Sequence, residues 1–355
     1  MASVELVVGT NKGLFIYKAD EARKTWSMAG PHLPGWDCYS VHRDSYGRII
    51  VGTSHFAYGA TFRVSDDGGV TFQQLEARPE YEKETGWTIK RIWQVVGHPT
   101  ERDTLYAGVE DAGLFVSKDR GQSWNELKGL TRTPGRKNWF PGGGGLCLHT
   151  ILVDPKNPKN MYVGISAVGV FRSRDGGETW TNHNQSLTKL PTGSPEVESA
   201  CCVHKMVIDP AKTDHLFMQY HGGVFESTDA AVTWNRIESG LPSNFGFPIV
   251  ITHRGELFIV PLKSDEQRFF PGEDVRVYRS KDNGRSWQGL TFGKPVDPSF
   301  TSVLRDSMAV DALPTPGVYL GTTAGEVFAS PYAGESWQRL PGTLPRINCV
   351  RAYTV

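Results

Sequence analysis

The sequence lacks the features that mark membrane proteins and nucleic-acid-binding proteins. No stretch approaches the run of about 18 apolar residues that a membrane-spanning helix needs. Lys and Arg together number 38, equal to Asp and Glu at 38, and no basic run or tail occurs. Phosphate backbones are held by clustered basic residues, so nucleic acid is not an expected partner. The chain enters a strand pattern at Val4 without an apolar signal segment, which predicts a cytoplasmic protein with no membrane partner.

Disulfide and nucleotide-binding signatures are also missing. The five cysteines are odd in number and show no disulfide-like spacing, which is typical of a reducing compartment. The glycine run 142–145 lacks the lysine and the helix of a phosphate-binding loop. We therefore expect no nucleotide cofactor, and we interpret the run as a flexible or close-packed approach to a strand.

A short motif is repeated along the chain in place of these features. In its clearest copy, Ser173 is followed by Asp175, Gly177, Thr179 and Trp180. Copies of the frame, two of them degraded, place their aromatic residues 46, 52, 56, 54, 53 and 50 residues apart. A regular period of this length indicates a repeat architecture. The seven copies lie at 19–26, 65–72, 117–124, 173–180, 227–234, 280–287 and 330–337.

Each motif has the composition of a tight turn between strands. The carboxylate accepts backbone N–H groups across the turn, and glycine adopts the positive φ angle that the turn requires. Short strands broken by Gly, Pro and Asp surround every copy, four to a repeat, which predicts an all-β, seven-bladed β-propeller with four-stranded blades in a single domain, 1–355. The chain starts on a second strand near 5–9 and ends on an unpaired first strand, 347–353, so we expect the two ends to close one blade.

The frame resembles the Asp-box, or BNR, repeat of sialidases and related propellers. That resemblance implies the propeller fold, with the Asp-boxes on peripheral hairpins away from catalytic groups. The chain departs from true sialidases, which have six blades, a Tyr–Glu nucleophile pair and an early Arg-Ile-Pro stretch; here Arg346-Ile347-Asn348 lies at the opposite end. The blade count is closer to xyloglucanase propellers, and seven-bladed sugar-acid lyases with a His-rich metal site offer a further parallel in fold.

Long segments are concentrated on one predicted face of the propeller, which favours a binding site there. They are 75–91, 128–146, 186–201, 263–275 and 289–305. Arginines in or beside them are expected to bind substrate charge, and aromatic residues are expected to stack on a sugar ring. The candidate substrate-binding residues are Arg91, Trp93, Arg136, Trp139, Phe269 and Arg305.

Alignment of the repeats brings ionisable residues to the same end of neighbouring blades. The innermost strands begin with Trp93, His149, His204 and Asp306, and Asp37 and Asn348 extend the series; second strands end near Glu110 and His221. Three imidazoles and a carboxylate form a plausible shell for Zn, Mn or Fe. The candidate metal ligands are His149, His204, His221 and Glu110, and Asp306 joins them as candidate catalytic residues.

Alternative interpretations remain for the same residues. A channel histidine can bond a backbone carbonyl or water, or serve as an acid or base. Cys147-Leu148-His149 and Cys202-Val203-His204 repeat a Cys-x-His pattern, which is also explained by small buried strand cysteines.

The sequence thus supports two hypotheses of function. The first is a glycosyl-hydrolase-like or lyase-like enzyme, a metal-dependent hydrolase or lyase, that acts on a polar, anionic carbohydrate or small molecule at the channel mouth. The second is a non-catalytic propeller scaffold that binds a protein or glycan partner through its loop aromatics.

Overall fold

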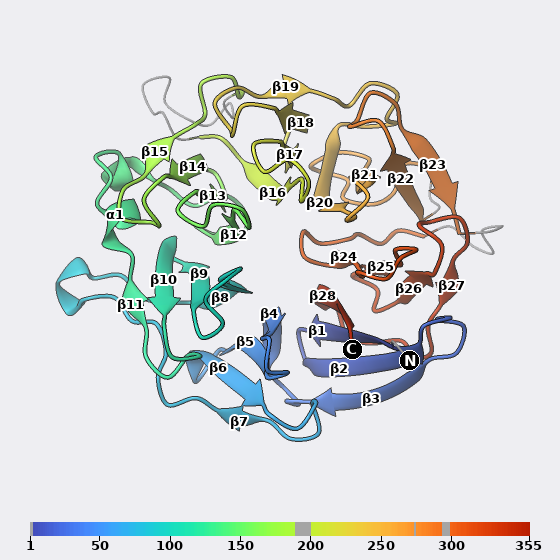
Figure 1. The fold of residues 1–355 in the computed structure, drawn as a ribbon, viewed down its shortest axis with the longest axis horizontal. Coiled ribbons are helices and arrows are strands. Elements are labelled where there is room, and N and C mark those ends of the chain that lie inside the picture. Colours follow the sequence, from blue (N-terminus) through green and yellow to red (C-terminus); the bar gives the residue numbers. More distant parts are fainter. Residues whose placement is uncertain (1–2, 189–199, 273–274, 293–298) are drawn as a thin grey trace.

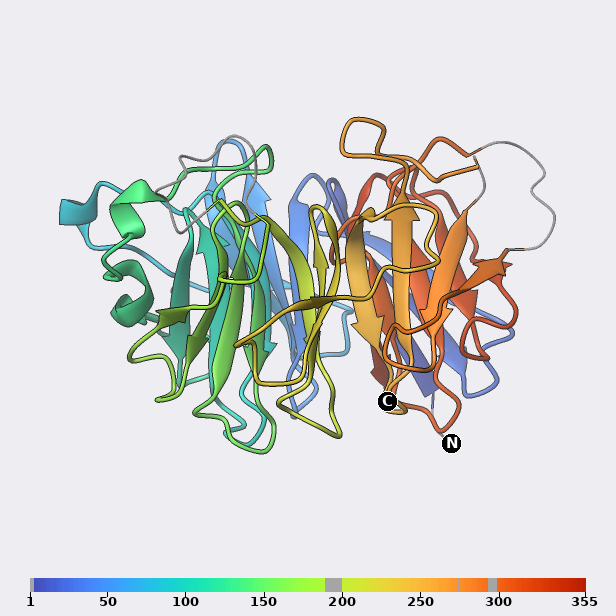
Figure 2. The ribbon, with the colours of Figure 1, turned by 90° about the horizontal axis from the view of Figure 1, so that it is seen from above.

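Seven four-stranded antiparallel sheets surround a central axis in the computed structural model (Figure 1). The structure describes residues 3–188, 200–272, 275–292 and 299–355. The predicted seven-bladed β-propeller is confirmed. Parts of the predicted long segments 186–201, 263–275 and 289–305 lie outside the described residues. The remaining long loops lie mostly on the face opposite the two termini (Figure 2).

Each blade is named here by its innermost strand, and its strands follow from the axis outwards. The β28 blade comprises β28 (Ile347–Thr354), β1 (Ser3–Thr10), β2 (Gly13–Asp20) and β3 (Ser27–His32). The β4 blade comprises β4 (Asp37–Arg43), β5 (Ile49–His55), β6 (Gly59–Ser65) and β7 (Gln73–Gln74). The β8 blade comprises β8 (Arg91–Gly97), β9 (Leu105–Glu110), β10 (Gly113–Ser117) and β11 (Asn125–Glu126). The β12 blade comprises β12 (Leu148–Val153), β13 (Met161–Ile165), β14 (Gly169–Ser173) and β15 (Thr181–Asn182).

Three further blades complete the ring. The β16 blade comprises β16 (Val203–Ile208), β17 (Leu216–Tyr220), β18 (Gly223–Ser227) and β19 (Asn235–Arg236). The β20 blade comprises β20 (Phe245–Ile251), β21 (Leu257–Leu262), β22 (Arg276–Ser280) and β23 (Gln288–Thr291). The β24 blade comprises β24 (Met308–Val310), β25 (Val318–Gly321), β26 (Val327–Ser330) and β27 (Gln338–Arg339). The helices are α1 (Lys128–Thr131) and the 3-10 turns η1 (Lys83–Thr85) and η2 (Arg136–Asn138). Within the described residues, no helix has the length and apolar character needed to cross a bilayer.

The two ends of the chain close the ring in one blade, as the sequence predicts. Strand β28 pairs antiparallel with β1, with Val350 opposite Val8 and Thr354 opposite Val4. Strand β1 pairs with β2 on its other side, so both of its backbone edges are occupied. This pairing removes the exposed sheet edge that an open ring would carry.

In five of the seven blades the repeated motif forms the same hydrogen-bonded turn between the third and fourth strands. Ser173 donates to Asp175 Oδ1 at 2.7 Å and accepts the Gly177 N–H at 2.8 Å. Thr179 donates its N–H and its hydroxyl to the same carboxylate at 3.0 and 2.6 Å. Gly177 has a φ of 97°, and a Cβ there would lie 2.9 Å from Leu127 Cδ1. The turn therefore requires the serine, the aspartate and a residue that tolerates positive φ.

The turn carboxylates predict a loss of stability in acid. Hydrogen bonds from Thr179 lower the pKa of Asp175 from 3.8 to about 2, and bonds from Ser286 do the same for Asp282. Because the folded pKa is depressed, this stabilisation is complete above the unfolded value near pH 4 and is lost as the pH falls through the folded value near pH 2. The midpoint temperature of thermal unfolding should therefore decrease as the pH is lowered from about 4 to about 2. The double variant Asp175→Asn, Asp282→Asn should show a shallower fall, and an unchanged slope would contradict this account.

Aromatic residues after the turns attach each blade to its neighbour. Trp124 of the β8 blade stacks on Phe62 of the β4 blade with ring centroids 4.9 Å apart. Trp26 meets Tyr319 of the β24 blade edge-on at 5.8 Å. Large apolar rings gain about 0.5–1.5 kcal/mol from such pairing beyond their area burial, so these contacts stabilise the ring.

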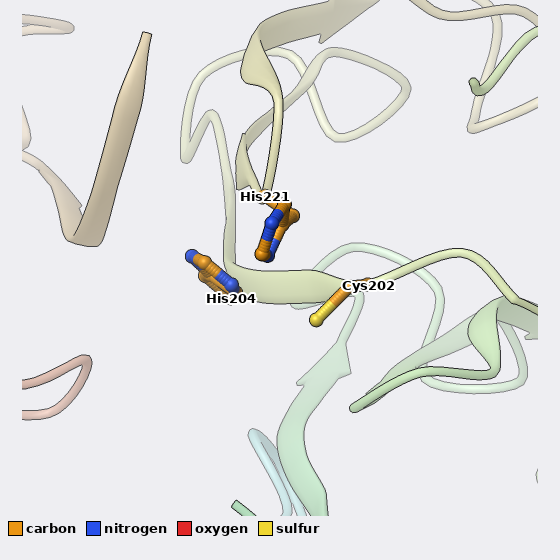
Figure 3. Close-up of side chains that lie close together, drawn as sticks. All are labelled: Cys202, His204 and His221. Atoms are coloured by element: carbon orange, nitrogen blue, oxygen red, sulfur yellow. The ribbon is translucent and has the colours of Figure 1, made fainter. Parts of the chain in front are cut away.

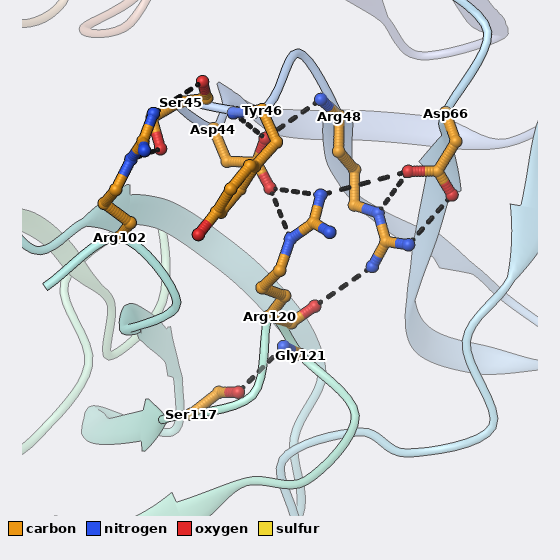
Figure 4. Close-up of polar contacts among 9 residues, drawn as sticks. All are labelled: Asp44, Ser45, Tyr46, Arg48, Asp66, Arg102, Ser117, Arg120 and Gly121. Carbon is orange, nitrogen blue, oxygen red and sulfur yellow. Dashed lines mark hydrogen bonds and ion pairs between the residues drawn. The ribbon is translucent and has the colours of Figure 1, made fainter.

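Charged groups reinforce one junction between neighbouring blades (Figure 4). Arg48 donates both Nε and Nη2 to Asp66 at 2.6 and 2.8 Å within the β4 blade. Arg120, from the turn of the β8 blade, donates to the buried carboxylate of Asp44 at 2.9 Å and lies over the Tyr46 ring. The junction therefore links the turn of one blade to the sheet of the next.

Candidate functional site

A register irregularity recurs near the start of six innermost strands. In five strands the ladder skips one residue and in β20 it skips two, and the skipped residues have no paired partner on the neighbouring strand. Bulges of this kind redirect a side chain and are common beside active sites. The skipped residues include Asn348, Tyr39, Trp93, His149, His204 and Phe247.

One member of the sequence-derived series is corrected by this register. Asp37 begins β4 and pairs with Ser54, whereas the skipped position of β4 is held by Tyr39. The stretch 38–40 is therefore equivalent to 92–94, with Tyr39 matching Trp93. The order of an apolar residue, an aromatic residue and a polar residue in both stretches was the signal available in the sequence.

The bulged residues and the loops around them enclose a pocket at the channel mouth with a volume of 480 Å³. Its floor and walls combine aromatic rings, arginines, two carboxylates and a glycine loop. The lining residues are Tyr39, Arg91, Trp93, Glu110, Gly143, Gly144, Gly145, Phe247, Arg268, Leu304, Arg305, Asp306, Arg346 and Asn348. We call this the channel-mouth pocket.

Glu110 is held at the pocket wall by two donors from the neighbouring strand. It is the last residue of β9, as the sequence predicts, and its Oε2 accepts Arg91 Nη1 and Trp93 Nε1, both at 3.1 Å. Burial opposes the charge of Arg91, but the nearby Tyr39 and Glu110 raise its pKa overall. This arrangement fixes the carboxylate, the cation and the indole as one unit.

The glycine run 142–145 packs against that carboxylate, and Gly143, Gly144 and Gly145 line the pocket beside it. Gly145 donates its N–H to Gly142 O at 3.0 Å, which closes a tight turn. Gly145 has a φ of 99°, and a Cβ there would lie 2.5 Å from Glu110 Oε1. Only glycine allows the backbone to approach the carboxylate so closely. Of the two alternatives for this run, close packing applies at Gly142 and Gly145, whereas Gly143 and Gly144 have open space around them.

Asp306 is the second carboxylate of the pocket and is tied to two cations. Its Oδ1 accepts Lys205 Nζ and Arg351 Nη2, each at 2.7 Å, and the residue is only 3% exposed. Burial alone would raise the pKa of Asp306, but Lys205 and Arg351 hold it below the ordinary range. We call these three residues the axial triad, because they join β16, the segment before β24, and β28.

Two arginines of the pocket form no ion pair within the described residues. Arg305 lies over the Trp93 ring at 5.3 Å, and its buried Nε has no hydrogen-bond partner in that part of the chain. Arg346 is exposed and forms no ion pair there. Arg268, in contrast, donates to Asp265 at 2.6 Å. The pocket therefore has positive charge that its own carboxylates do not balance.

The structure does not gather the four predicted metal ligands into one group. His149 Nε2 lies 3.0 Å from Val203 O and its Nδ1 lies 3.1 Å from Thr150 Oγ1, so both ring nitrogens are occupied within the protein. Burial lowers the pKa of His149 well below its ordinary value. Glu110 is engaged as described above. His204 and His221 do lie together, but their neighbour is Cys202.

Three predicted substrate-binding residues lie outside the pocket lining. Trp139 is buried against Phe171, and the Arg136 guanidinium covers it at 4.8 Å from the ring centroid. Phe269 packs edge-on against the exposed Phe300 at 5.5 Å, farther along the same loops. Arg91, Trp93 and Arg305 do line the pocket, whereas the structure gives Trp139 a packing role.

Comparison with known proteins supports the architecture and gives distant relatives. No model of a known protein family matches the chain. An oligoxyloglucan-reducing end-specific xyloglucanase from Emericella nidulans is 23% identical over 323 residues, covering 79% of this chain and 38% of that protein. The chain is a propeller with distant xyloglucanase relatives. It spans well under half the length of that relative.

Solved structures agree with the fold. A protein from Lactobacillus plantarum superposes with a TM-score of 0.64 at 13% identity, covering 99% of each chain. An ancestral GH74 enzyme superposes with a TM-score of 0.54 at 15% identity, covering 85% of this chain and 36% of that one. At these identities the likeness extends to the propeller fold alone.

Proposed function

We propose that this protein is a glycosyl-hydrolase-like enzyme that binds an anionic carbohydrate in the channel-mouth pocket. The distant xyloglucanase relatives support a carbohydrate as the ligand. The observation that carries the proposal is the pair of arginines, Arg305 and Arg346, which form no ion pair within the described residues. A ligand carboxylate would supply the missing charge, since Arg binds planar anions through paired N–H groups.

The aromatic residues of the pocket suit the remaining surface of a sugar. The rings of Tyr39 and Trp93 pack with centroids 4.9 Å apart, and both line the pocket together with Phe247. The indole nitrogen of Trp93 is fixed by Glu110, so the ring orientation is set before a ligand arrives. A rigid ring can cover the apolar C–H face of a sugar at a small entropy cost, which favours a pyranose over a flexible chain.

Hydrolysis of a glycosidic bond requires a proton donor and a second carboxylate. Burial raises the pKa of Asp37, although the nearby Asn348 and Arg91 act in the opposite direction. Asp37 lies just behind the pocket lining, where its side chain is hydrogen-bonded to the lining residue Asn348, and we assign it as the proton donor from that position. Glu110 is assigned as the second carboxylate because its side chain reaches the pocket wall. Asp306 is assigned neither role, because Lys205 and Arg351 already bind its carboxylate in the axial triad.

Calorimetric titration with charged and neutral oligosaccharides tests this proposal. An oligogalacturonide, which carries carboxylates, should bind with measurable affinity, and a neutral xyloglucan oligosaccharide should bind more weakly. Arg305→Gln and Arg346→Gln should each weaken binding of the oligogalacturonide by about 10- to 100-fold, the cost of one charge-assisted hydrogen bond. Arg254→Gln, which removes an exposed arginine at the turn between β20 and β21, is the matched control and should bind as the wild type does.

Measurement of turnover distinguishes a catalytic site from a site that only binds the oligosaccharide. Asp37→Asn should retain oligosaccharide affinity and lose at least about 100-fold in release of reducing ends, the usual contribution of a general acid. Equal affinity for the charged and neutral oligosaccharides, or no effect of either pocket arginine, would contradict the proposal. Tight binding without any turnover by the wild type would instead favour the non-catalytic scaffold.

A further inference from the structure

Three ligand-type side chains converge at one end of the β16–β17 hairpin (Figure 3). Cys202 immediately precedes β16, and His221 immediately follows β17. The backbone N–H of His221 donates to Cys202 O at 2.9 Å, which places the two residues side by side. His204 is the bulged residue of β16 and has no paired partner on β17. A bulge changes the direction of a side chain from the one that the regular alternation of a strand would give it. The backbone itself therefore brings the three side chains together.

The spacing of the group is close to that of a tetrahedral metal site. One ligand atom from each of Cys202, His204 and His221 lies within 4.8 Å of the others. Zinc bonds of about 2.0–2.3 Å at tetrahedral angles place ligand atoms about 3.3–3.6 Å apart, so small side-chain rotations would complete the site. Cys202 is 8% and His204 3% exposed, whereas the His221 side chain is 27% exposed. His221 thus leaves a path to solvent.

Both imidazoles have the outer contacts that orient metal-binding histidines. His204 Nδ1 lies 2.5 Å from Gly246 O, which leaves Nε2 available. His221 Nε2 lies 3.4 Å from Asp265 Oδ2, which leaves Nδ1 available. Metal-binding histidines almost always donate their other N–H to a carbonyl or a carboxylate in this way. His149, in the equivalent position of the next blade, has both nitrogens occupied and lacks this arrangement.

The group also borders the channel-mouth pocket. Phe247 stacks on His204 with ring centroids 4.7 Å apart and lines the pocket as well.

We propose that Cys202, His204 and His221 form a binding site for a single zinc ion. A thiolate with two imidazoles is a soft, nitrogen-rich set that favours Zn²⁺ over Mg²⁺ or Ca²⁺, which prefer oxygen. Three protein ligands leave one tetrahedral position for water or a ligand atom. The site differs from the set Glu110, His149, His204 and His221 expected from repeat register, and it does not depend on the identity of any sugar bound in the pocket.

The test is metal binding itself, measured on the full chain. Wild-type protein stripped with a chelator and titrated with Zn²⁺ should bind one equivalent, and Mg²⁺ should bind far more weakly. Co²⁺ in place of Zn²⁺ should give the visible bands of a tetrahedral site together with a thiolate charge-transfer band. Cys202→Ser and His221→Ala should each weaken Zn²⁺ binding by at least about 100-fold, since even outer contacts of metal ligands contribute 10- to 100-fold.

Cys147→Ser is the matched control, because Cys147 belongs to the same Cys-x-His pattern in the neighbouring blade. It should bind Zn²⁺ as the wild type does, and the partly exposed His221 provides a variant less disruptive to the core than Cys202. Circular dichroism and thermal unfolding confirm that each variant is folded before titration. Absence of stoichiometric Zn²⁺ binding by the wild type, or wild-type affinity in folded His221→Ala, would overturn the proposal. Neither result would affect oligosaccharide binding by Arg305 and Arg346.

Discussion

Removal of residues 347–355 is expected to abolish cooperative folding. The deletion removes β28, the innermost strand of its blade, and leaves β1 with an unpaired edge toward the axis. Ile347, Cys349 and Val350 are fully buried, and burying each aliphatic side chain contributes about 1.5–3 kcal/mol. Adding the ladder hydrogen bonds at about 1 kcal/mol each gives a loss comparable to the total stability of about 5–15 kcal/mol of a typical domain.

Differential scanning calorimetry of the truncated protein measures this effect directly. We expect no sharp unfolding transition and a loss of near-ultraviolet circular dichroism. Removal of Val355 alone, which is 47% exposed, is the matched control and should leave the transition nearly unchanged. A synthetic peptide of residues 347–355 added in trans should restore part of the transition. A truncated protein with an unchanged midpoint would show that ring closure does not stabilise the fold.

Asp306→Ala is expected to destabilise the fold by about 3–5 kcal/mol, the usual cost of breaking a buried ion pair. The variant leaves Lys205 and Arg351 as neighbouring cations without the carboxylate that both contact at 2.7 Å. Because the axial triad joins β16 and β28 to the segment before β24, its loss weakens the contacts between blades around the axis. Asp306 therefore has a structural role before any catalytic one.

Chemical denaturation of matched variants measures this difference. Asp66→Ala removes an aspartate that is also paired with an arginine, but its side chain is 48% exposed, so the expected loss is about 0–1 kcal/mol. The triple variant Asp306→Leu, Lys205→Met, Arg351→Met should be less destabilised than Asp306→Ala, because no unpaired charge remains. Equal losses for Asp306→Ala and Asp66→Ala would contradict the role assigned to the axial triad.

The propeller could be predicted because the repeated motif encodes both its turn and its spacing. Ser173, Asp175 and Gly177 are needed for local hydrogen bonds and a positive φ, so their recurrence marks each blade without reference to distant contacts. The closing strand was predictable for a similar reason, since an unpaired first strand at one end matched a missing first strand at the other.

The site was only partly predictable, because repeat register places backbones and does not determine what each side chain contacts. His149 and His204 occupy equivalent bulges, yet the first meets Val203 O and Thr150 while the second meets Gly246 O and His221. Tyr39 was missed because the alignment of repeats gave Asp37, two residues earlier, the position that the bulge gives to Tyr39.

The incorrect prediction for Trp139 and the omission of Cys202 have the same cause, which is that the deciding contacts are made by residues distant in the sequence. Trp139 lies in a long loop, but that loop folds back so that Phe171 and Arg136 cover the ring. Cys202 has the ordinary properties of a small buried strand residue, and its proximity to His221 follows only from the pairing of β16 with β17.

The most direct test of the proposed function is a crystal structure of the protein with an oligogalacturonide bound. We predict density for the sugar in the channel-mouth pocket, with one carboxylate within hydrogen-bond distance of Arg305 or Arg346 and a sugar ring against Trp93. Density for the oligosaccharide elsewhere on the propeller, or an empty pocket at saturating ligand, would contradict the proposal.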